Sequence, residues 1–162
     1  VADRTQMPYT DAVIHEIQHF TSFIPLGLLH TVTKDTRFRD DLTHLPFMSF
    51  SSPCVTSGTT IFPILSSVLH DSTEFPNPNE FNPGHFLNDN GTFRETEFFS
   101  SAGKRICPGE GLARMEIFLL MASILQNFTL KPVVDPQELS ITPTLSGTGN
   151  VSPAYQLCAF PR

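Results

Sequence analysis

A cysteine between two glycines is the residue of the sequence best suited to carry out chemistry. Cys107 stands in the run GKRICPG, flanked by Gly103 and Gly109, directly before a long apolar segment that begins at Glu110. Glycines allow positive φ and let the backbone approach a flat or bulky group closely. The free N–H groups at a helix N-terminus favour the thiolate, which is the form that binds a metal or attacks an electrophile. Arg105 adds a positive charge that can contact an anion.

Three roles for this cysteine follow from the residues alone. It can be a metal ligand, the nucleophile of a thiol-dependent hydrolase, or a buried free cysteine beside a tight turn, which is the commoner fate of a lone cysteine. A hydrolase needs a base within reach, and none of the six histidines is convincingly placed for that role. Because the histidines are scattered, without a His-x-x-Glu-His or Cys-x-x-Cys pattern, the sequence argues against a zinc site.

Composition excludes several classes of protein. The 162 residues are 40% hydrophobic and only 16% charged, which argues against a disordered acidic tail or a charge-laced coiled coil. The net charge of −6 argues against a nucleic-acid partner. Three widely spaced cysteines predict no disulfide framework and a reducing compartment. The longest apolar run, 117–125, is far shorter than the roughly 20 residues that cross a bilayer, so we expect no membrane span among these residues.

Two helices are predicted around this chemistry. Apolar residues recur with helical spacing over 10–20, where Thr5 or Thr10 can act as the N-cap. The segment 110–128 is the strongest helix prediction, and because it is apolar on most faces we expect it to be buried.

The rest of the chain favours short strands and loops. We predict short strands over 26–39, a strand running into a short helix over 59–69, a proline- and asparagine-rich loop over 71–91, and two or three strands over 130–162. The stretch 43–57 has no acidic residue, lysine or arginine, and its residues are mostly encoded by pyrimidine-rich codons. It is either a translated intron end, hence an aberrant insert, or a genuine surface loop, and composition alone leaves both open.

Taken together, these segments resemble the cytochromes P-450. Gly-x-Arg-x-Cys-x-Gly before a long helix resembles their haem-binding signature. The segment MPYTDAVIHEIQ resembles the K helix of the microsomal family 2 enzymes, and FPNPNEFNPGHFL resembles their meander, with Phe86 in the Pro-x-x-Phe position. AGKRICPGEGLARMEIFLL and SILQNFTL match the Cys loop (100–109) and the L helix, and PAYQLCAFPR resembles the C-terminal strand. The likeness covers nearly all residues except about 43–57 and corresponds to roughly the last third of such an enzyme.

The resemblance assigns roles to particular residues. It implies that Cys107 is the axial thiolate ligand of haem iron. Arg105 and His30 match positions that hold the haem propionates, although His30 alone could be a surface histidine at the start of a strand. Gly103 and Gly109 belong to the same cofactor loop. The residues expected to line the substrate pocket are Ile24, Pro25, Leu26, Leu29, Gly147 and Val151.

The fold implied is mainly α with small β-sheets (α+β), with the K helix over 10–20, the meander over 75–91 and the L helix over 110–128. The implied activity is a haem-dependent monooxygenase that inserts one oxygen atom from O₂ into lipophilic small molecules. Its electrons come from NADPH through a flavoprotein reductase. The expected location is the cytosolic face of the endoplasmic reticulum membrane, held by an N-terminal anchor that these residues do not contain. As a fragment, the chain is not expected to be active alone.

The sequence also departs from the family pattern. The family's Glu-x-x-Arg, which holds the K helix to the meander, is Glu16-Ile17-Gln18-His19 here. Histidine is shorter than arginine, mostly neutral at pH 7, and lacks the planar five-donor fork, so we expect weaker retention of haem. Ser100 stands where the resemblance expects phenylalanine, and 43–57 lengthens one loop. These departures favour an alternative, a non-enzymatic product of a degraded or mis-spliced gene copy that binds no haem.

Overall fold

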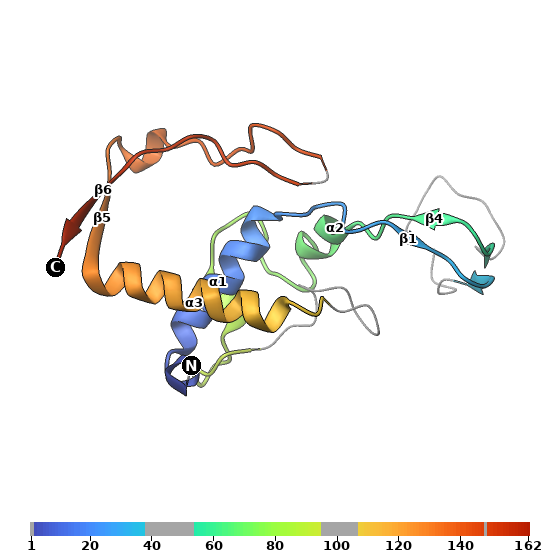
Figure 1. Ribbon diagram of the computed structural model, residues 1–162, viewed down its shortest axis with the longest axis horizontal. Coiled ribbons are helices and arrows are strands. Elements are labelled where there is room, and N and C mark those ends of the chain that lie inside the picture. The colour runs from blue at the N-terminus through green and yellow to red at the C-terminus, as the bar shows by residue number, and fades with distance from the viewer. Residues whose placement is uncertain (1, 38–53, 95–106, 148) are drawn as a thin grey trace.

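The computed structural model describes residues 2–37, 54–94, 107–147 and 149–162 (Figure 1). Its elements in chain order are η1 (Ala2–Gln6), α1 (Pro8–Thr21), β1 (His30–Thr31), β2 (Thr36–Arg37), β3 (Cys54–Val55), β4 (Thr60–Ile61), α2 (Leu65–Leu69), η2 (Pro83–Phe86), α3 (Glu110–Asn127), β5 (Phe128–Pro132), η4 (Pro136–Glu138) and β6 (Leu157–Pro161). The long helix α3 crosses α1 near the centre, and the strand pairs lie at the two ends (Figure 1).

The two main helices lie where the sequence predicts them, with different ends. α1 begins at Pro8, whose fixed φ suits the first helical position, and the residue before it, Met7, makes no side-chain cap bond. The predicted caps Thr5 and Thr10 are therefore wrong. The helix stops at Ser22, which adopts a left-handed conformation with φ of 41°. α3 ends one residue earlier than expected because Phe128 is already extended and starts β5.

The described strands form three small antiparallel pairs. β1 pairs with β4, β2 with β3, and β5 with β6, and the last pair runs over five residue pairs from Phe128–Pro161 to Pro132–Leu157. An isolated bridge joins Leu145 to Val151. Cys54 and Val55 at the end of the unusual 43–57 stretch therefore belong to a strand pair, while 43–53 lie outside the described residues. The arrangement agrees with a mainly α fold that carries small β-sheets.

The core lies between α1, α2 and the loop that holds η2. Ala12, Leu69, Phe75 and Phe86 form one buried apolar cluster, and each is at most 2% exposed. The inward face of α1 also buries polar side chains in the same place, including His15, Glu16 and His19. Buried polar groups need partners, so the contacts of these three side chains decide how α1 meets the loop.

The prediction that 110–128 is a buried helix is wrong for this structure. In α3 only Phe118 is buried among the described side chains, whereas Leu112, Leu119, Leu120 and Leu125 are 43–63% exposed. A helix that is apolar on most faces needs neighbours on most sides. Among the described elements, the main contacts of α3 are with α1 and with β5, the strand that follows it. Within the described part of the chain, no helix has the length and apolar character needed to cross a bilayer.

Candidate functional site

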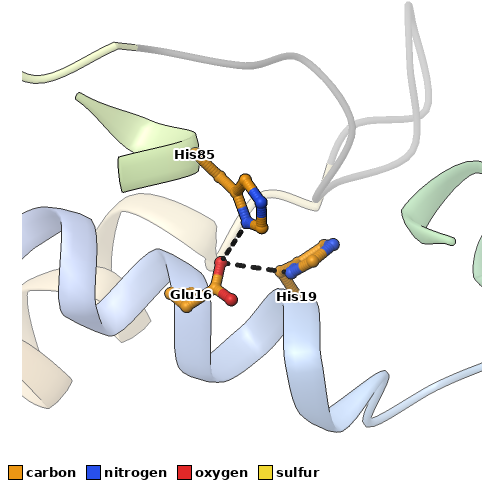
Figure 2. A group of neighbouring side chains, drawn as sticks. All are labelled: Glu16, His19 and His85. Carbon is orange, nitrogen blue, oxygen red and sulfur yellow. Dashed lines mark hydrogen bonds and ion pairs between the residues drawn. The ribbon is translucent and has the colours of Figure 1, made fainter. Parts of the chain in front are cut away.

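A buried carboxylate joins α1 to the loop that carries η2. Glu16 is completely buried, and its Oε1 accepts the backbone N–H of Asn82 at 2.8 Å. Its Oε2 lies 3.1 Å from Nδ1 of His85, which projects from η2 (Figure 2). The carboxylate thus reaches two groups that lie 66 and 69 residues away in the sequence.

The loop presents these partners because its local sequence caps η2. The Asn82 side chain accepts the N–H of Gly84 at 2.9 Å, and Pro83 occupies a first-turn position of the short helix. His85 donates its Nε2–H to the Pro76 carbonyl at 2.7 Å, which fixes the orientation of the ring. Phe86, which the resemblance marks as structural, is fully buried beside the rings of Phe75 and His15.

His19 lies on the same face of α1 as Glu16 but connects the helix to a different element. Its Nε2–H donates to the Leu69 carbonyl at the end of α2, at 2.7 Å. Its Nδ1 lies 3.1 Å from Glu16 Oε2, yet this buried nitrogen makes no hydrogen bond within the described residues. Burial lowers the pKa of His19, and the Glu16 charge and the Leu69 hydrogen bond offset part of that effect. His19 therefore does not supply the permanent positive charge that arginine would have there.

The cysteine of the predicted cofactor loop lies just ahead of α3. Cys107 is an exposed free thiol, and its carbonyl accepts the N–H of Glu110 at 3.2 Å. Gly109 is the N-cap residue, with φ of −91°, so it does not use the positive φ for which we expected glycine. A Cβ at this position would lie 4.0 Å from Cys107 Sγ, at the limit of ordinary contact. Gly103, Arg105 and Ser100 lie outside the described residues.

An exposed sulfur directly ahead of an 18-residue helix is open to a metal ion from outside the protein. His30, the second predicted propionate contact, is half-buried in β1, and its side chain has no hydrogen bond or ion pair among the described residues. It is therefore available to an external anion. The donors that the structure describes fit the haem cofactor implied by the sequence.

The two segments expected to line a substrate pocket meet at the end of α1. Asn150 donates its backbone N–H to the Phe23 carbonyl at 2.9 Å, and its side-chain amide donates to the carbonyls of Ser22 (2.9 Å) and Thr21 (3.2 Å). In the first segment, Gly27 has φ of +63°, and a Cβ there would lie 2.5 Å from the Pro63 carbonyl oxygen. Only glycine fits that turn without strain.

A cleft of about 590 Å³ opens beside this junction. Its walls include Phe20, Phe23, Ile141, Asn150 and Tyr155. The predicted pocket residues, Ile24, Pro25, Leu26, Leu29, Gly147 and Val151, do not line it, although residues next to them do. The sequence analysis missed Phe23 and Asn150. Neither residue belongs to a periodic pattern. The only sequence signal for them is that Phe23 directly precedes Ile24 and Asn150 directly precedes Val151, two of the predicted pocket residues.

The arrangement of a free thiol before a long helix, a buried glutamate on an earlier helix and a proline-rich loop between them has a counterpart in a known family. A family model described as Cytochrome P450 matches residues 1–159. The chain belongs to the cytochrome P450 family.

Known relatives agree with this membership. The chain is 53% identical to Cytochrome P450 2H1 of Gallus gallus over 164 residues, and 53% identical to Cytochrome P450 2C29 of Mus musculus over 161 residues. These matches cover 100% and 98% of this chain but only 31% and 30% of the two relatives, so the chain spans about a third of their length. The expected resemblance to the microsomal family 2 is confirmed. Haem, the cofactor predicted from the sequence, is the cofactor of this family.

Proposed function

We propose that this chain supplies the haem-thiolate part of a monooxygenase that inserts one oxygen atom from O₂ into lipophilic small molecules. The observation that carries the proposal is the exposed free thiol of Cys107 directly ahead of α3, in a chain that the family model matches over residues 1–159. When bound, haem supplies the oxygen chemistry, and its thiolate ligation favours O–O cleavage.

The residues of the chain have distinct tasks in this proposal. Cys107 would provide the sulfur ligand of the haem iron from its exposed position directly ahead of α3. Gly109, where a Cβ would lie 4.0 Å from Cys107 Sγ, would leave room beside the sulfur for a flat macrocycle, and the resemblance assigns Gly103 to the same loop. Arg105 and His30 would hold the haem propionates, and the ring nitrogens of His30, which have no partner among the described residues, support its part. Glu16 keeps the meander against α1, which holds the loop on one side of the core.

The substrate, partner and location follow from the same proposal. Apolar side chains along 24–29 and around Val151 favour a lipophilic substrate, and Asn150 joins the second of these segments to the end of α1, directly before the first. Electrons come from NADPH through a flavoprotein reductase. Relatives in the microsomal family 2 indicate an association with the endoplasmic reticulum, and we propose its cytosolic face, with attachment through an N-terminal anchor outside these residues. Because the chain spans only 31% of its chicken relative, we expect it not to catalyse alone.

One observation favours a second candidate function, a non-enzymatic product that binds no haem. His19 stands where the family's arginine holds the K helix, and it leaves the buried Glu16 carboxylate without an arginine partner among the described residues. A weaker connection between α1 and the meander would loosen the haem loop. The two candidates differ in whether haem is retained with histidine at position 19.

The test is a chimera in which this chain replaces the matching last third of Cytochrome P450 2H1, expressed with a haem supply. We expect the red-shifted reduced carbon-monoxide spectrum of thiolate ligation, its loss in Cys107→Ala, and its retention in Cys158→Ala, which removes another exposed free thiol. Retention of haem only after His19→Arg would support the second candidate. Absence of haem in every variant, while the unaltered relative binds it, would overturn the proposal.

A further inference from the structure

The strongest cluster of ligating side chains outside the haem loop is formed by Glu16, His19 and His85. One donor atom from each lies within 4.8 Å of the other two, and all three residues are buried. Both Nδ1 atoms lie 3.1 Å from the same oxygen, Oε2 of Glu16. Figure 2 shows the two rings directed at this carboxylate from α1 and from η2.

The remaining ring nitrogens determine what the two Nδ1 atoms can offer. His19 Nε2 and His85 Nε2 each face a backbone carbonyl at 2.7 Å, from Leu69 and Pro76 respectively. A carbonyl oxygen can only accept, so each Nε2 carries the proton. In the neutral ring, Nδ1 then has its lone pair free. Metal-binding histidines are typically held in this way, with the second ring N–H donated to a carbonyl or a carboxylate.

Among the described residues, only the two histidines face the Glu16 carboxylate as possible carriers of positive charge. Glu16 is 0% exposed, and no lysine or arginine among the described residues pairs with it. His19 Nδ1 is buried, faces Oε2, and makes no hydrogen bond in the described structure. An uncompensated buried charge is costly, so the Glu16 carboxylate needs a positive charge beside it, which a proton on a histidine Nδ1 or a bound cation can supply.

We propose that Glu16, His19 and His85 bind a divalent zinc ion that joins α1 to the meander. Zinc takes nitrogen and oxygen ligands at about 2.0–2.2 Å in tetrahedral geometry, which separates neighbouring donors by about 3.3 Å. The two 3.1 Å separations already lie close to that value. Three protein donors leave the fourth position to water, as in other sites of two histidines and one glutamate. The expectation of no zinc site rested on local spacing, and it did not consider histidines brought together by the fold.

The test uses the 162-residue chain, stripped with a chelator and with its exposed thiols alkylated so that sulfur cannot bind metal. Calorimetric titration with Zn²⁺ should give one ion per chain and a zinc-dependent rise in the melting temperature. Co²⁺ in place of Zn²⁺ should give the intense visible bands of a tetrahedral site. Absence of a stoichiometric zinc ion in the unmutated chain would overturn the proposal.

Three variants separate the site from general effects on folding. His19→Gln keeps a side-chain N–H within reach of the Leu69 carbonyl but removes Nδ1, so zinc affinity should fall at least about tenfold. His19→Arg gives Glu16 a permanent cation, so the chain should fold and bind no zinc at this site. His70→Ala removes an exposed histidine whose side chain, among the described residues, bonds to Ser66 in the preceding helical turn, and this variant should bind zinc as the unmutated chain does. Equal zinc affinity in His19→Gln and the unmutated chain would also refute the proposal. The failure of the haem spectrum in the chimera has no bearing on this titration.

Discussion

The packing of the small core between α1 and the meander predicts how much stability the substitution Phe86→Ala removes. Phe86 is 0% exposed, and its ring centroid lies 5.8 Å from that of Phe75 and 5.7 Å from that of His15. Truncation of a buried phenylalanine to alanine costs about 3–5 kcal/mol, of which part depends on the cavity that remains. Here the surrounding rings cannot close the cavity easily. His15 Nδ1 is held by the Asp11 carbonyl at 2.8 Å and His19 Nε2 by the Leu69 carbonyl at 2.7 Å.

We therefore expect a loss of about 4–5 kcal/mol in the free energy of unfolding for Phe86→Ala. The matched control is Phe81→Ala, in the same loop, where the side chain is 50% exposed and its ring lies against Phe20 at 5.8 Å. Half the burial predicts a loss of about 1 kcal/mol. The difference of about 3 kcal/mol corresponds to more than a hundredfold change in the unfolding equilibrium.

The assay is urea unfolding followed by far-ultraviolet circular dichroism, since the chain has no tryptophan. If Phe86→Ala does not fold, Phe86→Leu keeps most of the volume and should lose about 1–2 kcal/mol. A free energy of unfolding for Phe86→Ala within 1 kcal/mol of that for Phe81→Ala would refute the claim that this cluster carries the packing of η2 against α1.

Two further predictions concern the end of α1 and its buried histidines. Asn150→Ala removes three side-chain hydrogen bonds, two donated to the carbonyls of Thr21 and Ser22 and one accepted from the Ser146 hydroxyl, so amide exchange should accelerate around 149–151. Asn127→Ala, which removes a single bond to Ser123, should leave that exchange unchanged, and equal exchange in both variants would contradict the role of Asn150. Burial lowers the pKa of both His15 and His19 below the ordinary value of 6.5, so the unfolded chain binds more protons than the folded one as the pH falls past that value. In chelator, the free energy of unfolding should therefore be greatest above about pH 6.5 and decrease below it, by at most about 1.4 kcal/mol per pH unit for each histidine; a flat or rising profile would contradict this account.

Local patterns predicted the positions of the main helices but not their ends or their surroundings. The apolar spacing along 10–20 marked α1, yet Pro8 rather than Thr5 or Thr10 determined where the helix begins. The apolar character of α3 predicted burial, whereas the described chain supplies only α1 and β5 as its main contacts. The apolar residues of a helix show which side chains can be buried. Which of them are buried depends on the elements that pack against the helix.

Chemistry that depends on local spacing could be predicted from the sequence alone. Cys107 precedes a helix because glycines and a long apolar run follow each other along the chain, and Glu16 and His19 share a face because helical residues three apart are neighbours. The distant groups that contact these residues became visible only in the folded chain. His85 comes to Glu16 from 69 residues away, and Asn150 comes to Thr21 from 129 residues away. Such contacts depend on the path of the loops and on the pairing of buried polar groups. The hydrophobic periodicity of a single segment predicts neither of these.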